Sequence, residues 1–539
     1  MKRGTRVATI AAGLAALVLA SGLGLYRFLK IEGTQSHGIG IFSGWREGLR
    51  VSRQLVKGET GFRGASADVT WVEQRVTAEA PLLTVDKTVF GLSLLAGRDG
   101  VHAVLGEKES YLTPDDLLSQ QAYSVPCWWG PFKLRCGVDV DKVLNGLARE
   151  LGTTSNDVWQ NARLTRFVVR RENKAPALTL IQRMSQGALA SARHLARNLR
   201  PDGKYRYEIN AITDASSDAG YSLARHAGAT LFLAKAADHF HDVELEAAAL
   251  RAARWLAREM TQKCGDNECV GAKNEGVTLG ASALALLAYA ELVPQSSVND
   301  AQFFRTRMTA LAGYLRSVQR ADGEFMQGFN LRRNQPVDVQ FRYFTGEAAY
   351  ALARAHRITG DARDLAAATK ALAYIVSHWS FFGSRYLFDA EHWTCQAVRE
   401  LWQRAPDRQA LEFCLRWTEF NRALQNRDGS YGAIDLLSPP RVTQAATMAE
   451  GGVATLVTAV RAQLEPTLRV RVEDQVRSAL DFLLSQQFNV GHEYLFKNPY
   501  LIEGALPGSP VDYTLRIDYP QHAGNAMLYY LDFLEQGAK

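Results

Sequence analysis

Hydrophobic and polar positions repeat along the last two thirds of the chain, where two kinds of helical pattern alternate. In the first kind, apolar residues are three and four positions apart, as at Leu245, Ala249, Ala252 and Leu256, which leaves one face polar. In the second kind, as over 279–292, nearly every residue is apolar or small. Half-exposed helices are expected at about 180–199, 243–262, 302–319, 362–379, 408–425 and 468–487, and enclosed ones at about 219–238, 276–293, 343–358, 389–404, 447–463 and 519–535.

Enclosed helices that alternate with half-exposed ones require an inner and an outer layer, and short connections make neighbouring helices antiparallel. Several outer helices end in an Asp-Gly-x-aromatic turn, at Asp202-Gly203, Asp322-Gly323 and Asp428-Gly429. In these turns, glycine permits a positive φ and the aromatic residue packs back over the helices. With these turns, residues 175–539 resemble the (α/α)6 toroid superfamily. The resemblance implies a mainly α fold of six helical hairpins around a central cavity.

Residues 31–174 have a mixed pattern that predicts a small α/β domain. Strands are expected at 69–76, 101–105, 110–112 and 166–171. Thr113 is placed as the N-cap of one helix, and Gly152 ends another helix over 140–151. The polar residues 172–174 mark the predicted boundary with the helical part.

The first 30 residues form a separate segment. Lys2, Arg3 and Arg6 precede an apolar run from Val7 to Tyr26, which has about the 20 residues needed to cross a bilayer. This pattern resembles a bacterial signal anchor, although cleavage after Ala20 is an alternative. The sequence thus predicts a single-pass inner-membrane protein with its body in the periplasm, close to the membrane and beside a polysaccharide synthesis or export complex.

Composition and charge exclude some classes of protein. With 539 residues, 47% of them hydrophobic, the chain can bury a large core, which excludes a disordered protein. The net charge of +6 is spread over helices of mixed sign, without a long basic block. Nucleic acid is therefore not expected as a partner.

Two cysteine pairs are predicted to form disulfides in an oxidising compartment. Cys127 and Cys136 bracket one short loop, and Cys264 and Cys269 bracket another. Neither spacing is that of a zinc site and no histidine lies nearby, so neither a metal nor a cofactor is expected. Cys395 and Cys414 lie in predicted helices and are interpreted as buried thiols.

The enclosed helices open on polar residues. Because these helices all begin at the same end of the predicted barrel, their first turns should converge on one cavity, where helix dipoles favour anions. The candidate acid and base residues are Glu347, Glu391, Glu450, Asp518, His226, His392 and His522. The candidate substrate-binding residues are Arg225, Arg516, Tyr343, Trp393, Tyr513 and Tyr519.

Each candidate also has a purely structural interpretation. Glu347 and Glu391 could complement a helix dipole, His226 and His522 could be packing residues, and Asp518 could cap its helix. Taken together, however, several carboxylates and imidazoles in one enclosed space would shift each other's proton affinity, which is typical of a reactive site.

These residues predict a membrane-tethered carbohydrate-active enzyme that acts on an envelope or extracellular polysaccharide. Carboxylates suit hydrolysis, histidines suit epimerase-like proton transfer, and arginines suit acidic sugars. Aromatic residues in the connections could stack on sugar faces. The alternative is a non-catalytic glycan-binding or assembly subunit. An isoprenoid-processing toroid is disfavoured because the sequence contains no Asp-rich diphosphate motif.

Overall fold

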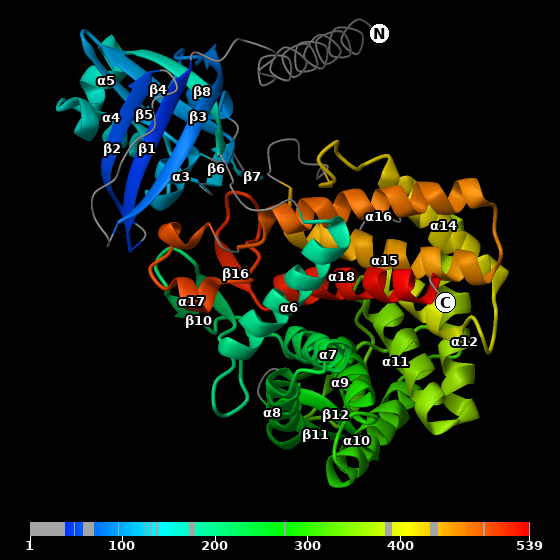
Figure 1. Cartoon of the computed structure of the whole chain (residues 1–539). Helices are drawn as coiled ribbons and strands as arrows, with labels where there is room; N and C mark the ends of the chain where they lie inside the picture. Colours follow the sequence, from blue (N-terminus) through cyan, green and yellow to red (C-terminus); the bar gives the residue numbers. More distant parts are fainter. Residues whose placement is uncertain are drawn as a thin grey trace, which may run out of the picture.

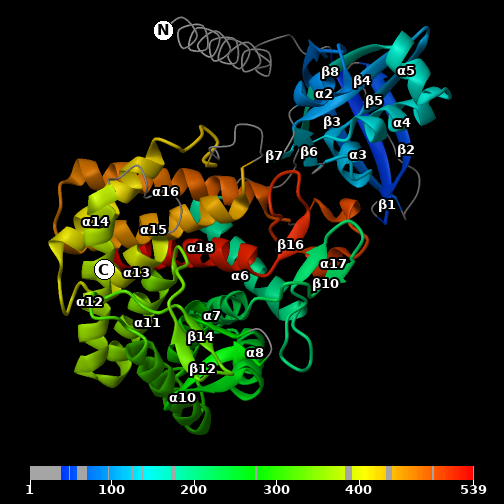
Figure 2. The same cartoon turned by 180° about the vertical axis from the view of Figure 1, so that it is seen from behind.

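The computed structural model describes most of the chain. The described residues are 38–47, 49–57, 69–94, 96–123, 126–129, 132–135, 138–171, 178–273, 276–382, 391–431, 440–488 and 491–537. Within them, a strand-rich part formed by the first third of the chain lies beside a larger helical part (Figures 1 and 2).

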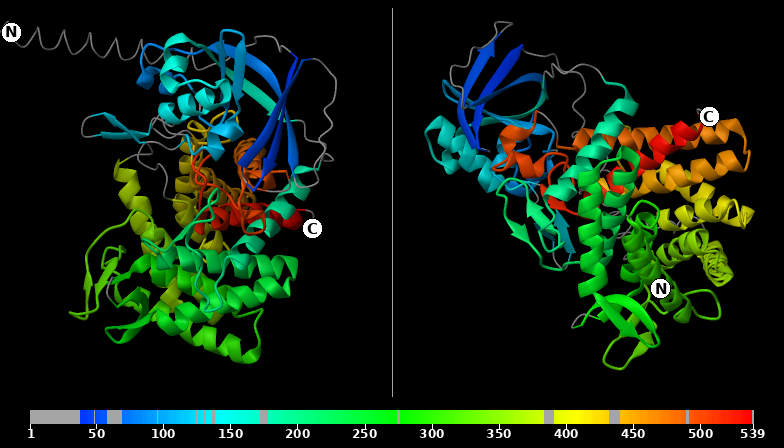
Figure 3. Two further views of the ribbon diagram at one scale, coloured as in Figure 1. Left: turned by 90° about the vertical axis from the view of Figure 1, so that its left-hand side faces the viewer. Right: turned by 60° about the horizontal axis from the view of Figure 1, so that its bottom comes forward.

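Six enclosed helices form a closed inner ring. Each packs against the next along the chain, and the last one packs against the first, so the ring is complete. Figure 3 shows this helical part from two further directions. The inner helices are α7 (Leu223–Phe240), α9 (Leu279–Leu292), α11 (Phe344–Thr359), α13 (His392–Leu401), α15 (Val442–Arg461) and α18 (Asp518–Gly537).

Six outer helices surround this ring, and each one packs on an inner helix. The earliest outer helix, α6, packs on the last inner helix, α18, so the two ends of the helical part close the barrel. The predicted six-hairpin toroid is therefore present in the described residues. The outer helices are α6 (Leu180–Arg197), α8 (Val243–Glu259), α10 (Val298–Ser317), α12 (Ala362–Phe382), α14 (Arg408–Arg422) and α16 (Pro466–Gln486).

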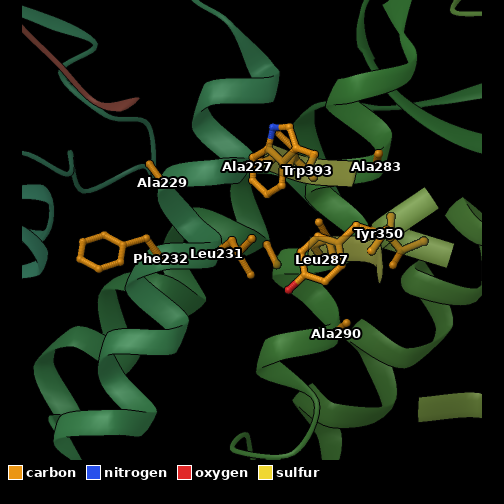
Figure 4. Packing of buried hydrophobic residues seen from close by; sticks show 14 of the residues in the cluster. Ala227, Ala229, Leu231, Phe232, Ala283, Leu287, Ala290, Tyr350 and Trp393 are labelled. Atoms are coloured by element: carbon orange, nitrogen blue, oxygen red, sulfur yellow. The ribbon is translucent and has the colours of Figure 1, made fainter. Parts of the chain in front are cut away.

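Small residues allow the inner helices to approach one another closely. A Cβ atom added at Gly524 of α18 would lie 2.0 Å from the Phe232 ring of α7, and one added at Gly346 of α11 would lie 2.7 Å from Oγ1 of Thr394 in α13. Larger side chains fill the space further along the same helices, and Phe232 and Tyr350 are both buried (Figure 4). The recurring glycines of the helix openings are thus explained by helix packing.

The three Asp-Gly turns anchor outer helices to one another. Gly203, Gly323 and Gly429 all have positive φ values, as predicted. A Cβ atom added at any of them would lie within 2.5 Å of a backbone carbonyl oxygen in the next outer helix. These contacts repeat at equivalent places, which explains why the sequence repeats the turn.

The aromatic residues of the connections are mostly packing residues. The side chains that follow the Asp-Gly turns are almost completely buried, and so are several others that were considered for sugar stacking; these are Tyr205, Tyr207, Phe325, Phe329, Tyr431 and Tyr494. Sugar stacking therefore cannot be assigned to the connections as a group.

The strand-rich part contains a six-stranded antiparallel sheet in the order β2-β1-β3-β8-β4-β5. Its strands are β1 (Ile39–Arg46), β2 (Leu49–Lys57), β3 (Thr70–Pro81), β4 (Asp99–Leu105), β5 (Lys108–Leu112) and β8 (Arg163–Arg171). The sequence pattern did not predict β1 and β2. Seven of the eight residues of β1 are buried, so this strand lacks the alternation that identifies a half-exposed strand.

The two helix ends that the sequence predicted in this part are present, and two further helices were not predicted. Thr113 caps α3 (Pro114–Ser119) through a reciprocal hydrogen-bonding pattern with Asp116, and α4 (Val140–Leu151) ends at Gly152 in the left-handed conformation. The remaining helices are α2 (Lys87–Leu92) and α5 (Ser155–Asn161), and β6 (Pro126–Trp129) and β7 (Phe132–Arg135) form a separate hairpin. The predicted boundary at 172–174 lies outside the described residues.

The strand-rich part shares a hydrophobic core with the connection between α16 and α18. Trp45 of β1 packs against Tyr494 with ring centroids 5.3 Å apart, and the Tyr494 hydroxyl donates a hydrogen bond to Asp115 over 2.9 Å. Phe488 and Phe496 belong to the same cluster. The two parts are therefore joined by a packed apolar interface, which the sequence alone did not indicate.

The cysteines differ from prediction in one respect. The expected Cys264–Cys269 disulfide is present. Cys395 and Cys414, interpreted as buried thiols, also form a disulfide, which links α13 to α14. The helical spacing of these two residues concealed the pair because they meet only when the two helices pack. The side chains of Cys127 and Cys136 lie outside the described residues.

The predicted inner-membrane localisation is contradicted. No helix among the described residues combines the length and the apolar character needed to cross a bilayer. The predicted anchor itself, over residues 1–30, lies outside the described residues.

Candidate active site

A cavity of about 500 Å³ opens where the inner helices begin. Every inner helix contributes at least one residue, which agrees with the expected convergence of their first turns. Its volume lies within the range of about 300–1,000 Å³ that is common for small-molecule sites. The lining residues are Ser222, Ala224, Arg225, Leu284, Tyr343, Phe344, Glu347, His392, Trp393, Arg441, Thr443, Gln444, Thr447, Asp518, Gln521 and His522.

Two histidines that line this cavity, from α13 and α18, lie close to a buried glutamate of α15, Glu450. His522 Nδ1 lies 2.7 Å from Glu450 Oε2, within hydrogen-bonding distance. His392 Nε2 lies 3.9 Å from the same oxygen, and the two imidazole centroids are 5.5 Å apart. Neither ring nitrogen of His392 has a hydrogen-bond partner among the described residues. His392 is therefore available to a ligand.

The two histidines differ in the direction of their pKa shifts. Burial lowers the pKa of His392 well below the usual value, and the nearby His522 lowers it further. Burial also opposes the charged form of His522, but the charge and hydrogen bond of Glu450 outweigh burial and raise its pKa. The cavity therefore presents one neutral imidazole beside one that holds its proton more firmly.

Glu347 supplies a neutral carboxylic acid. Burial alone raises the pKa of this side chain well above the usual range. Its Oε2 atom has no hydrogen-bond partner among the described residues, and a Cβ atom added at Gly280 would lie 2.4 Å from it. The glycine that opens α9 therefore makes room for this carboxyl group.

Asp518 is held by two arginines. Arg516 contacts both carboxylate oxygens of Asp518, with distances of 2.6 and 2.9 Å. Arg225 Nε lies 3.3 Å from Oδ2 of the same carboxylate and also donates a hydrogen bond to the Tyr207 hydroxyl. Burial opposes ionisation of Asp518, but its interaction with Arg516 prevails and lowers the pKa. Asp518 is thus an ionised but engaged carboxylate.

Six predicted residues are not among those that line the cavity, and three of these six are His226, Glu391 and Tyr513. His226 is fully buried: its ring nitrogens lie 2.7 Å from the Tyr221 hydroxyl and 3.1 Å from the Ala252 carbonyl oxygen. Glu391 accepts a hydrogen bond from Thr394 at the start of α13. Tyr513 packs on Phe488 with ring centroids 5.0 Å apart. The contacts of these three residues agree with a structural role better than with a role in catalysis or substrate binding.

Arg516 and Tyr519 lie just behind the lining. The Arg516 guanidinium lies over the Tyr519 ring at 4.8 Å from its centroid and also contacts Asp518. By contrast, Tyr343 and Trp393 line the cavity, and Tyr343 is 40% exposed whereas Trp393 is only 3% exposed. Tyr343 therefore lies at the entrance and Trp393 deeper inside.

Sequence reasoning missed several lining residues, notably Arg441, Thr447 and Gln521. Arg441 immediately precedes α15, and no carboxylate partner lies beside it among the described residues. Gln521 directly precedes His522. The helical spacing from Arg441 to Thr447 could have indicated that side of α15, had the start of the helix been placed at Val442 instead of near 447.

The two histidines and the glutamate described above could also hold a metal ion. The ligand atoms of His392, Glu450 and His522 lie within 4.8 Å of one another. Two imidazoles and a carboxylate are a ligand set that Zn²⁺ accepts. The expectation that no metal takes part therefore stays a prediction, and it is tested together with the function.

The fold is similar to that of two solved epimerase structures. One is a sugar epimerase from a ruminal bacterium, with a TM-score of 0.52, 10% identity, and coverage of 66% of this chain and 99% of the other. The other is cellobiose 2-epimerase from Bacillus thermoamylovorans B4167, with a TM-score of 0.51, 11% identity, and coverage of 66% and 99%. No family model and no curated protein matches the sequence. At these identities the likeness establishes the toroid fold alone.

Proposed function

We propose that this chain is a carbohydrate-active enzyme of the epimerase or isomerase type, which moves a proton at the carbon next to the carbonyl group of a reducing sugar. The observation that carries the proposal is the pair of histidines in one cavity, with centroids 5.5 Å apart and opposite pKa shifts. The names of the two solved structures of similar fold agree with it.

The reaction needs a base, an acid and a group that stabilises the enolate oxygen. Neutral His392 removes the proton, and the electron pair of the C–H bond moves through the carbon skeleton onto the carbonyl oxygen. The Glu347 carboxyl group donates a hydrogen bond to that oxygen. Protonated His522 then returns a proton from the other side, which inverts the carbon centre, and Glu450 stabilises the imidazolium form of His522. No oxidant or reductant is consumed.

The carboxylates support proton transfer better than glycoside hydrolysis. Hydrolysis requires a protonated carboxyl group and an ionised carboxylate that is free to act as base or nucleophile. Glu347 meets the first requirement. Asp518, the ionised carboxylate that lines the cavity, is already bound by Arg516 and Arg225. A carboxylate held by two guanidinium groups is a weak base because protonation would break both ion pairs.

The test is to incubate the protein with reducing monosaccharides and disaccharides and to separate the products by chromatography. An epimer or a ketose of unchanged mass supports the proposal. Shorter sugars would indicate hydrolysis and unsaturated sugars would indicate elimination. Measurable sugar binding without any product would favour the glycan-binding alternative. Parallel reactions with a chelator such as EDTA show whether a metal takes part, and we expect equal rates.

Substitutions of Glu347 show whether its carboxyl group donates only a hydrogen bond or transfers a proton. In the proposed reaction Glu347→Gln retains a neutral donor, so we expect kcat to fall by about tenfold at most, whereas Glu347→Leu removes the donor and should cost about 10²–10³-fold. Steady-state kinetics on both variants measure this difference. If Glu347→Gln is as inactive as Glu347→Leu, Glu347 transfers a proton and a hydrolytic role regains support.

The pH dependence follows from the two histidines. His522 must be protonated, so activity is lost as pH rises through its raised pKa, above the usual value of about 6.5. His392 must be neutral, so activity is lost only when pH falls through its lowered pKa, well below that value. We expect a bell-shaped profile of kcat/KM with its alkaline limb above pH 6.5. A profile without that limb contradicts the role of His522.

A further inference from the structure

A second cavity, of about 300 Å³, lies where the inner helices end, and we call it the rear cavity. All six inner helices contribute residues from their C-terminal halves, as Lys235, Glu291, Arg354, Arg399, Arg461 and Tyr529 show. The candidate active site lies at the opposite ends of the same helices. The two cavities share no lining residue.

Part of the charge in the rear cavity is internally balanced. Glu291 lies 2.9 Å from Arg354 and 3.9 Å from Lys235. Glu400 lies 3.2 Å from Arg357 and 3.6 Å from Arg354. These five side chains form a continuous ion-pair network in which each cation has a carboxylate partner.

Three further arginines have no such partner. Arg399, Arg404 and Arg461 also line the rear cavity, yet none of them has a carboxylate oxygen within 4.0 Å among the described residues. Arg461 donates a hydrogen bond to the backbone carbonyl of Arg399, so the two residues are adjacent. Partial burial lowers the pKa of Arg461, and the positive charge of Arg399 lowers it further. Two more carboxylates, Asp238 and Asp532, also line the rear cavity, so six lysine and arginine side chains face four carboxylates there. The cavity therefore holds an excess of positive charge.

A buried hydroxyl group adds an unused hydrogen-bond donor. Tyr529 is 3% exposed, and its hydroxyl has no hydrogen-bond partner among the described residues. The Arg399 guanidinium and the Lys235 ammonium each lie 4.5 Å from the centroid of its ring. A buried donor without an acceptor is destabilising unless a ligand or water accepts its hydrogen bond.

Helix dipoles explain only some of these cations. The negative ends of six helices converge here, and cations near helix C-termini are stabilised. This effect stabilises Arg357, Arg399 and Arg461, which lie in the last turns of α11, α13 and α15. It does not apply in the same way to Lys235 and Arg354, which lie further inside their helices, and it does not explain why the buried hydroxyl of Tyr529 lacks an acceptor.

We propose that the rear cavity binds a multivalent phosphate, either inorganic pyrophosphate or a small organic phosphate. Arginine side chains bind phosphate oxygens through paired, charge-assisted hydrogen bonds, and the ligand would also accept the hydrogen bond of Tyr529. The cavity volume of about 300 Å³ suits a small ligand. Bound phosphate would neutralise Arg399, Arg404 and Arg461 together.

Isothermal titration calorimetry on the full chain tests this proposal, with pyrophosphate, orthophosphate and a sugar phosphate at constant ionic strength. The test variant is Arg404→Gln/Arg461→Gln, since both side chains are exposed and the fold should persist, which circular dichroism verifies. The matched control is Arg416→Gln, an exposed arginine on outer helix α14 that lies outside both cavities. We expect pyrophosphate to bind the wild type and the control equally, and the double variant at least tenfold more weakly.

Two results would overturn the proposal: no pyrophosphate binding to the wild type at millimolar concentration, or binding that the double variant leaves unchanged. Preference for the sugar phosphate over pyrophosphate would identify an organic phosphate as the ligand, whereas the reverse order would identify the inorganic one. Because this experiment measures binding to the rear cavity, its result does not depend on whether the candidate active site catalyses epimerisation.

Discussion

Replacing His392 by asparagine is expected to lower kcat by about 10²–10⁴-fold, the usual contribution of a general base. His392 has no hydrogen bond to lose within the described residues, so the substitution removes a proton acceptor without breaking a structural contact. Asparagine retains a polar side chain of smaller volume. Steady-state kinetics on a sugar substrate, together with a thermal melt, separate the loss of chemistry from the loss of fold.

The matched control for this variant is His241→Asn. His241 is an exposed histidine that ends α7 in the left-handed conformation, which asparagine also tolerates, so activity and stability should both remain unchanged. If His392→Asn retains more than a tenth of the wild-type kcat, His392 is not the base. An unfolded His392→Asn protein would instead show that the imidazole has a packing role.

The second large effect is expected from Gly524→Ala at the closure of the inner ring. Alanine in a helix interior usually gains about 1 kcal/mol over glycine. Here the new methyl group would lie 2.0 Å from the Phe232 ring, which is fully buried. Overpacking of this kind costs about 1–3 kcal/mol or more, so we expect a net decrease in the free energy of unfolding. Chemical denaturation measures it.

A double-mutant cycle with Phe232→Leu shows whether the cost arises from that contact. Leucine removes the ring atoms that the methyl group would meet, so Gly524→Ala should be better tolerated beside it, with a coupling free energy of about 0.5–3 kcal/mol. If Gly524→Ala instead stabilises the wild-type protein, α18 and α7 do not pack as described and the inner ring is not closed there.

The sequence predicted the helical layers well because burial has a clear periodic signature. The run over 279–292 is apolar on all sides, which only an enclosed helix can tolerate, and it forms α9. The predicted polar openings likewise lie at one end of the barrel. Which side chains face the cavity was less predictable, because helices such as α15 start several residues away from their predicted starts. A shift of that size changes which side chains point toward the axis.

Other features depend on contacts between residues far apart in the chain. The Cys395–Cys414 disulfide, the packing of Tyr494 on Trp45 and the contact of Arg225 with Asp518 leave no local sequence signal. The sequence alone also could not distinguish a packing role from a proton-transfer role for each histidine. His226 and His522 both stand beside Ala-Gly, yet His226 is bonded within the core whereas His522 meets Glu450 at the cavity.

The most direct test of the account is to run the reaction in D₂O and to locate deuterium in the recovered sugar by NMR. Since His522 exchanges its proton with solvent before donating it, the account predicts deuterium at the inverted carbon, next to the carbonyl group, in the wild-type product and none with His392→Asn. Product that forms at the wild-type rate without deuterium at that carbon would contradict the histidine-pair mechanism.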